Sequence, residues 1–122
     1  MQKIIFDSSF LMAVVETPTT WFEDMIEIVG GFRPILLECV KFELESLASE
    51  GGSRARTAKV ALELSSKFSL ERCGGARVDD EIVSAAKTAG AVVATVDSEL
   101  LGSLKAAHVG AITLGAGRVR LF

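Results

Sequence analysis

Short apolar runs alternate along the chain with segments in which apolar residues recur every three or four positions. Unbroken runs suit buried strands, whereas the three-to-four spacing is typical of helices that pack one face on a core. The pattern predicts strands at residues 3–6, 34–37, 91–96 and 111–114, with weaker ones near 72–73 and 119–122. It predicts a helix that begins near residues 8–9, and further helices at 19–29, 38–48, 53–68, 79–89 and 97–107.

Buried strands that alternate with helices predict an α/β fold with a central, mostly parallel sheet between layers of helices. No linker, internal repeat or low-complexity tract divides the sequence, so we expect one domain over residues 1–122. Parallel sheets of this kind bind ligands beyond the carboxyl ends of their strands. The residues that directly follow each apolar run are therefore the candidates for function.

Composition narrows the classes of protein to consider. Of the 122 residues, 49% are hydrophobic and 24% are charged, which suits a globular domain and excludes a disordered one. The net charge of −3 argues against nucleic-acid binding through bulk charge, but it allows an acidic nuclease that recruits cations. No apolar run is long enough to span a membrane, and Asp7 comes too early for a signal peptide, so we expect a cytoplasmic protein.

Histidine and cysteine are scarce. The single histidine, His108, argues against a histidine metal centre or a Ser-His-Asp triad. Cys39 and Cys73 lack metal-ligand spacing and are too few for a disulfide framework. We expect two reduced, buried thiols, and a bridge between them stays open because the sequence says nothing about their separation.

Four acidic residues stand on apolar helical stripes. Asp7, Asp79 and Asp97 are each followed by apolar residues at offsets of three, four and seven, which place these side chains on the face that packs inward. Glu43 interrupts a similar stripe inside the helix predicted at 38–48. Asp7 and Asp97 also end strands, so they belong to the ligand-binding edge of the sheet.

A carboxylate on a core-facing stripe is costly unless something pairs with it. Each aspartate alone fits a helix cap. Four together need a shared counter-charge, which Mg²⁺ or Mn²⁺ supplies because hard cations prefer carboxylate oxygens. We predict that Asp7, Glu43, Asp79 and Asp97 bind the metal, and that Asp80 reaches it at most through water because it turns ~100° from Asp79. Two flanking hydroxyl residues could orient a ligand or water, or simply pack and cap: Ser9 and Thr95.

At these residues the sequence resembles the PIN-domain family of metal-dependent nucleases. The segments that carry the resemblance are residues 4–11, 40–47, 78–86 and 94–101, which read IIFDSSFL, VKFELESL, VDDEIVSAA and ATVDSELL. Each segment contains one of the four acids, and the order and spacing of all four match the family. The resemblance covers nearly the whole chain.

The resemblance implies a ribonuclease that hydrolyses RNA phosphodiester bonds with Mg²⁺ or Mn²⁺ and forms a homodimer. The closest likeness is to archaeal and eukaryotic members linked to ribosomal RNA processing, and the family's VapC toxins are neighbours. An antitoxin or a ribosome-processing partner therefore belongs to the expectation. Family members often have asparagine where this chain has Ser9. That departure keeps a rival open: a PIN fold retained as an RNA-binding or scaffold subunit with little or no activity.

Contact with RNA would rest on local clusters of positive charge, because the total charge is negative. The alternative is that these side chains lie on ordinary solvated surfaces. Aromatic residues are few and most belong to apolar runs, so no base-stacking platform is evident. The candidate RNA-binding residues are Arg54, Arg56, Lys59, Arg118 and Arg120.

Overall fold

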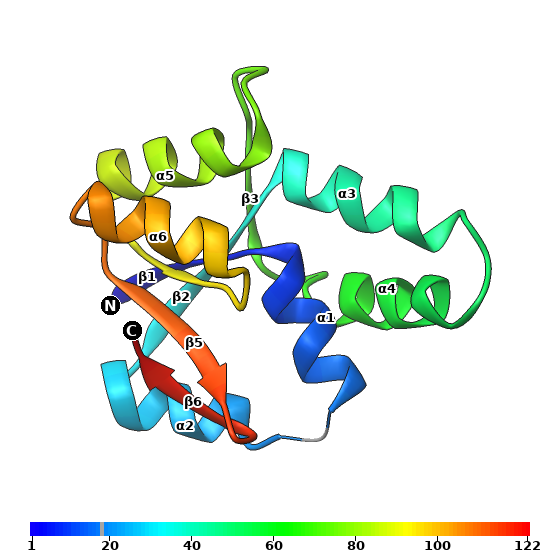
Figure 1. Ribbon diagram of the computed structural model, residues 1–122, viewed down its shortest axis with the longest axis horizontal. Coiled ribbons are helices and arrows are strands. Elements are labelled where there is room, and N and C mark those ends of the chain that lie inside the picture. Colours follow the sequence, from blue (N-terminus) through cyan, green and yellow to red (C-terminus); the bar gives the residue numbers. More distant parts are fainter. Residues whose placement is uncertain (18) are drawn as a thin grey trace.

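The computed structural model describes residues 1–17 and 19–122, and its elements follow the predicted order (Figure 1). The strands are β1 (Gln2–Phe6), β2 (Phe32–Leu37), β3 (Ser69–Glu71), β4 (Val92–Ala94), β5 (Ala111–Gly115) and β6 (Arg118–Leu121). The helices are α1 (Ser8–Glu16), α2 (Trp21–Val29), α3 (Glu38–Ala48), α4 (Ser53–Leu64), α5 (Val78–Ala89) and α6 (Ser98–Ala106).

The strands form one sheet in the order β3-β2-β1-β4-β5-β6. Neighbouring strands are parallel except β6, which runs antiparallel to β5. Because crossovers between parallel strands are right-handed, the chain places its helices on opposite faces as it winds outward from β1 in each direction. Figure 1 shows α5 and α6 on one side of the sheet and α1, with α4 beside it, on the other. The predicted α/β fold with a mostly parallel sheet between helices is confirmed.

The core is centred on β1, whose Ile4, Ile5 and Phe6 expose no surface. This strand pairs with β2 along one edge and with β4 along the other, and helices cover both faces of the sheet, so its sequence is an unbroken apolar run. Phe6 also packs against the ring of Phe10 in α1, with ring centroids 5.7 Å apart, and against that of Trp21 in α2 at 5.9 Å. These contacts fix the first helices relative to the end of β1.

Helix α2 is tied to the edge strand β6 by an ion pair. Asp24, a buried residue of α2, accepts hydrogen bonds from Nε and an Nη of Arg118 at 2.9 and 3.0 Å, and from the backbone N–H of Val119 at 3.1 Å. The Arg118 guanidinium, followed by the Val119 N–H, lowers the pKa of Asp24 from 3.8 to about 2. The pairing satisfies a carboxylate that burial would otherwise penalise.

Several element boundaries differ from the prediction, and the weak strand expected near 72–73 lies earlier, at Ser69–Glu71. The helix expected at 53–68 ends at Leu64, because the Ser65 hydroxyl donates to the carbonyl of Ala61 at 2.9 Å and the chain then turns into β3. The strand expected at 91–96 stops at Ala94, because the backbone N–H of Val96 donates to the Ser9 hydroxyl at 3.1 Å instead of to a strand.

Cys39 and Cys73 form a disulfide, in contrast to the two reduced thiols that the sequence favoured. Their Cα atoms lie 6.1 Å apart because β3 runs beside β2, which brings the segment after β3 next to the first turn of α3. The bond therefore links the start of α3 to the loop that leads into α5. In the described residues, none of the helices has the length and apolar character needed to cross a membrane.

Candidate active site

The site predicted from the sequence lies where the winding of the sheet reverses. The chain passes from β1 outward to β2 and β3, then returns to add β4 on the other side of β1. In open α/β sheets the carboxyl ends of two such strands border a crevice in which ligands bind. Asp7 directly follows β1, and Thr95 directly follows β4. The backbone N–H of Asp7 donates to the carbonyl of Ala94 at 2.9 Å, which joins the two strand ends.

Asp7 is held rigidly at this point. Its side chain is only 5% exposed, and its Oδ2 accepts hydrogen bonds from the hydroxyls of Ser9 at 2.5 Å and Thr95 at 2.8 Å. Both bonds use the same oxygen, so Oδ1 receives none from the described residues. In the described residues, every fully buried side-chain oxygen has a hydrogen-bond partner. Because Oδ1 has none, it is not fully buried and is open to the crevice. The carboxylate therefore has one oxygen fixed by the protein and one available to a ligand.

Ser9 and Thr95 connect the two strand ends. Their hydroxyl oxygens are 3.0 Å apart, and each also accepts a backbone hydrogen bond: Ser9 from Val96 at 3.1 Å, and Thr95 from Asp97 at 3.1 Å. Each hydroxyl thus donates to Asp7 while it accepts from the segment that carries Asp97. Serine, although shorter than the asparagine common in the family, still reaches the carboxylate of Asp7.

Glu43 enters the site from α3, the helix that begins where β2 ends. Its Oε1 accepts a hydrogen bond from the Ser8 hydroxyl at 3.1 Å, and the side chain is half-buried. Burial raises the pKa of Glu43 above 4.5, and the negative charges of Asp7 and Asp79 raise it further, against the opposing effect of the Ser8 hydroxyl. The carboxylate of Glu43 therefore interacts with the other candidate ligands.

Asp79 lies in the first turn of α5, on the side that faces the sheet edge. Burial raises its pKa above 3.8, and the charges of Asp7, Asp97 and Glu99 add to that rise, while Arg77 opposes it. Glu99 lies off the apolar stripe of α6, yet its charge also acts on Asp79. Glu99 immediately follows the first residue of α6, so its charge stands at the same end of that helix as Asp97.

Asp97 fulfils the capping role that the sequence offered as an alternative. Its Oδ1 accepts from the backbone N–H groups of Glu99 at 2.8 Å and Leu100 at 3.3 Å, which caps α6. Its Oδ2 receives no hydrogen bond from the described residues, and the residue is exposed. The cap fixes one oxygen and leaves the other free, as at Asp7.

The four predicted ligands thus lie around one edge of the sheet. Besides burial, the charges of Asp7 and Asp79 raise the pKa of Glu43, and those of Asp7 and Asp97 raise the pKa of Asp79. Across residues 1–17 and 19–122, no three Asp, Glu, His or Cys side chains are yet close enough to form a metal-binding group. The donor chemistry nevertheless fits a hard divalent cation, because Asp7, Glu43 and Asp97 each keep a carboxylate oxygen without a hydrogen bond. The positive charge of a cation bound among them would offset the repulsion between these carboxylates.

Two acids beside Asp79 behave differently from it. Asp80 is exposed and makes no side-chain hydrogen bond within the described chain, so its proposed role through water stays a prediction. Glu81 turns back to the loop before α5, where its Oε1 accepts from the backbone N–H groups of Gly74 at 2.6 Å and Ala76 at 3.0 Å. Glu81 thereby fixes the approach to the helix that carries Asp79.

The candidate RNA-binding residues separate into different places. Arg54 lines clefts beside the site, whereas Arg56 and Lys59, on the same helix, are exposed and line neither. The guanidinium of Arg118 pairs with the carboxylate of Asp24. The guanidinium of Arg120 packs over Gly115 of β5. It lies so close that a Cβ added to this glycine would be 2.5 Å from Cζ of Arg120. Arg54 is therefore the strongest of the five.

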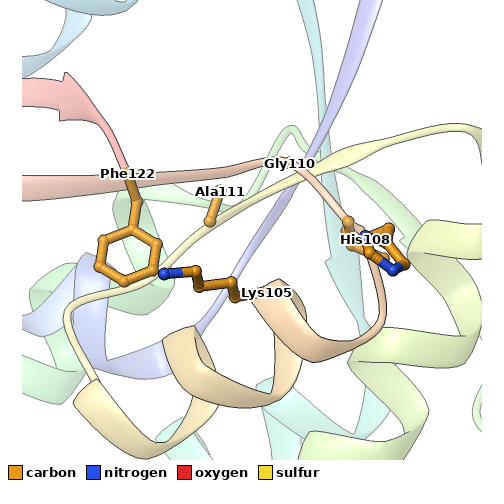
Figure 2. Close-up of a pocket in the computed structure, with 6 residues that line it drawn as sticks. Lys105, His108, Gly110, Ala111 and Phe122 are labelled. Atoms are coloured by element: carbon orange, nitrogen blue, oxygen red, sulfur yellow. The ribbon is translucent and has the colours of Figure 1, made fainter.

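A cavity of about 540 Å³ lies at the opposite edge of the sheet, where β5 begins. Figure 2 shows Lys105 extending toward the ring of Phe122 and His108 lying on the other side of Gly110. Because Ala111 opens β5, this cavity borders the amino end of the strand and not the carboxyl end that carries the acids. His108 is thus remote from the candidate site.

Comparison with known structures agrees with this fold. The PIN domain endonuclease Utp24 is 23% identical, with a TM-score of 0.78 over 98% of this chain and 90% of that one. A domain of a functionally unknown protein from Methanocaldococcus jannaschii is 19% identical, with a TM-score of 0.70 over 95% and 93% of the two chains. A mutant T5 5′-exonuclease is 15% identical, with a TM-score of 0.55, over 97% of this chain but 52% of that enzyme.

The sequence of this chain matches no curated protein. The sequence model of the family described as "PIN like domain" matches residues 4–117, which include all four candidate ligands and both hydroxyls that hold Asp7. Since this match spans nearly the whole chain, the protein belongs to the PIN-like domain family.

Proposed function

We propose that this chain is a divalent-metal-dependent ribonuclease that hydrolyses RNA phosphodiester bonds at the sheet edge formed by Asp7, Glu43, Asp79 and Asp97. One observation carries the proposal most strongly. Asp7 is buried at the sheet's switch point, fixed through Oδ2, and close enough to Glu43 and Asp79 to raise the pKa of each. Membership of a family whose structural relatives include nucleases supports the same conclusion.

The roles of the protein groups follow from their surroundings. Ser9 and Thr95 hold the carboxylate of Asp7, and the Ser8 hydroxyl holds Oε1 of Glu43. Asp97 is fixed by the backbone of α6. Such support positions a ligand set before substrate arrives, and its loss typically lowers activity or metal affinity about 10–100-fold.

Mg²⁺ or Mn²⁺ suits these oxygen donors, and when bound it would lower the pKa of a water and offset negative charge on the phosphodiester. Without a cation, the carboxylates would repel a polyanionic substrate. The four acids therefore need neutralisation before RNA can approach. That requirement links cation binding to substrate binding in this chain.

The direct test compares Glu43→Gln with Glu45→Gln, which lies two residues further along α3 and is exposed. Calorimetric titration should show Mn²⁺ binding to the wild type and to Glu45→Gln, and strongly reduced binding to Glu43→Gln. The rate of cleavage of single-stranded RNA should fall in Glu43→Gln and stay near wild type in Glu45→Gln. The fall should exceed ~100-fold, which is the largest loss typical of a residue that only supports a metal ligand. Equal Mn²⁺ binding and cleavage in both variants would contradict the proposal.

The biological setting of the cleavage stays a prediction. Ribosomal RNA processing and a toxin role use the same chemistry, and they differ in partner: a processing complex or an antitoxin. A small antitoxin reading frame next to this gene would favour the toxin role. The scaffold alternative predicts folded protein that binds RNA and leaves it intact at every Mn²⁺ concentration.

A homodimer also belongs to the proposal. Phe22 and Ile26 lie four residues apart on α2, so they share one face, and both side chains are more than 40% exposed. Light scattering at micromolar concentration should give twice the chain mass of 13.0 kDa. A value equal to that mass would contradict the dimer.

A further inference from the structure

Two clefts meet beside the candidate site and form one groove across α1, α3 and α4. The first, of about 650 Å³, includes Glu43, and the second, of about 430 Å³, includes Ser9. They share Ser8, Leu47 and Arg54, so we call them together the Arg54 groove. Because Ser8 donates to Glu43, a ligand in the Arg54 groove lies directly beside a candidate metal ligand.

An exposed aromatic ring lines this groove. Phe42 precedes Glu43 on α3, lines the first cleft, and is 63% exposed. No stacking platform was predicted from the sequence, because Phe42 stands in an ordinary amphipathic helix. Phe6, Phe10 and Trp21, in contrast, pack against one another in the interior. Phe42 is therefore an aromatic face open to a ligand next to the site.

Arg54 supplies the positive charge of the groove. It lies in the first turn of α4 and lines both clefts. The ion pair found among the described residues joins Arg118 to Asp24, so no carboxylate of those residues lies within 4.0 Å of the Arg54 guanidinium. An unpaired guanidinium presents a planar set of donors that suits a phosphate group.

The other charges of the groove are negative and limit where a phosphate can sit. Besides Glu43, the first cleft includes Glu50 and the second includes Glu16. Of the described residues that line either cleft, Arg54 is the cation. A polyanion is therefore attracted at Arg54 and repelled at Glu16 and Glu50, which confines its path to the part of the groove beside Ser8 and Glu43.

We propose that the Arg54 groove binds a single-stranded segment of RNA, with a base stacked on Phe42 and a backbone phosphate on Arg54. The inference rests on the proposed function in taking RNA as the ligand, and it adds a binding site and the two side chains that would hold the strand there. A base paired within a duplex is stacked between its neighbours and cannot lay a face on Phe42. The groove therefore selects unpaired RNA over duplex RNA. Base–aromatic stacking tolerates any sequence, so selectivity for sequence is weak.

The test measures the affinity of a fluorescein-labelled single-stranded RNA by anisotropy, with Ca²⁺ present to neutralise the acids and a gel to show that the RNA stays intact. Phe42→Ala is compared with Phe122→Ala, which removes an exposed ring outside the groove. Arg54→Ala is compared with Arg56→Ala, two residues along the same helix and outside both clefts. Phe42→Trp serves as a variant that retains an aromatic face.

Phe42→Ala and Arg54→Ala should each weaken single-strand binding about 10-fold, while Phe122→Ala and Arg56→Ala stay within about twofold of wild type. Phe42→Trp should bind as tightly as wild type. Arg54→Ala should also reduce the slope of log affinity against log salt by about 0.7, as expected for one lost phosphate contact to a single strand. A duplex of the same sequence should bind more weakly than the single strand, and Phe42→Ala should not change its affinity.

The inference is overturned if Phe42→Ala binds like wild type, if duplex binds as tightly as single strand, or if wild type binds no single-stranded RNA. These outcomes are separate from a failure of the proposed function. If the predicted binding pattern holds but no Mn²⁺ concentration yields cleavage, the groove stands and the ribonuclease proposal fails. If RNA is cleaved but Phe42→Ala binds normally, the ribonuclease stands and the groove assignment fails.

Discussion

The hydroxyl of Thr95, just beyond β4, donates a hydrogen bond of 2.8 Å to Oδ2 of Asp7, just beyond β1. The two residues are 88 positions apart in sequence, and their contact joins the two strand ends at the switch point of the sheet. Thr95 exposes no surface, so its hydroxyl has no access to water as an alternative partner. This bond joins the fold to the site, because the strand pairing that builds the core also orients the first candidate ligand.

Replacing Thr95 by Val keeps the shape of the side chain and removes its hydroxyl. Asp7 then loses one of two hydrogen bonds to Oδ2, and the backbone N–H of Asp97 loses its acceptor. We expect Mn²⁺ affinity or RNA cleavage to fall about 10–100-fold. Thr95→Ser, which retains the hydroxyl, should stay near wild type. Equal activity of the two variants, both shown to be folded by circular dichroism, would mean that the hydroxyl does not position Asp7.

Reduction of the disulfide should destabilise the protein. The bond between Cys39 and Cys73 spans 34 residues, and such a link stabilises a small domain by about 2–4 kcal/mol, mainly by restricting the unfolded chain. Urea unfolding with and without a phosphine reductant measures the difference. A variant with both cysteines replaced by alanine should not respond to reductant. If reductant leaves the wild type unchanged, the bond contributes nothing to stability.

Asp24→Asn should lower the melting temperature at neutral pH, because it removes the charge that pairs with Arg118. The pKa of Asp24 is lowered to about 2, so its contribution to stability is present above the ordinary value of 3.8 and is lost as pH falls toward about 2. The gap in melting temperature between wild type and Asp24→Asn should therefore shrink across that pH range. A gap that is constant from pH 7 to pH 2.5 would contradict this assignment.

In the absence of metal, Glu43→Gln should change the melting temperature in the opposite direction to Asp24→Asn. The pKa of Glu43 is raised, so protonation favours the folded state, and that stability is present below 4.5 and is lost as pH rises through the raised value. At pH 7 with a chelator, Glu43→Gln should melt at a higher temperature than wild type, because it removes the cost of burying a charged carboxylate and the repulsion with Asp7 and Asp79. At pH 4 the difference should disappear. A lower melting temperature for Glu43→Gln at pH 7 in chelator would show that these carboxylates do not repel one another.

The sequence predicted the fold well because its signals were local and mutually consistent. The unbroken run that became β1 and the apolar stripe after Asp97 each had one reasonable interpretation. The boundary errors have specific causes. Ser65 ends α4 through its own hydroxyl, and Ser9 takes the backbone N–H of Val96 away from β4. Bonds of that kind depend on three-dimensional neighbours that periodicity does not report.

The candidate site was predictable in its carboxylates but not in its supporting contacts. Asp7 and Asp97 stood out because acids at strand ends and on apolar stripes are unusual. The pairing of Cys39 with Cys73 depends on β2 lying beside β3, and the burial of Asp24 under Arg118 depends on β6 folding back to α2. Phe42 was missed for a related reason: its exposure in a groove follows from the packing of α3 against α4.

We expect that the acids facing the sheet edge, and not their neighbours, bind the cation that RNA cleavage requires. Adjacent Asp79 and Asp80 test it most directly, since they differ by ~100° in direction on one helix. The measurement is the rate of single-stranded RNA cleavage with excess Mn²⁺ by the wild type, Asp79→Asn and Asp80→Asn, each shown to be folded. We predict that Asp79→Asn is inactive and that Asp80→Asn retains measurable turnover. An inactive Asp80→Asn beside an active Asp79→Asn, or no cleavage by the wild type, would contradict it.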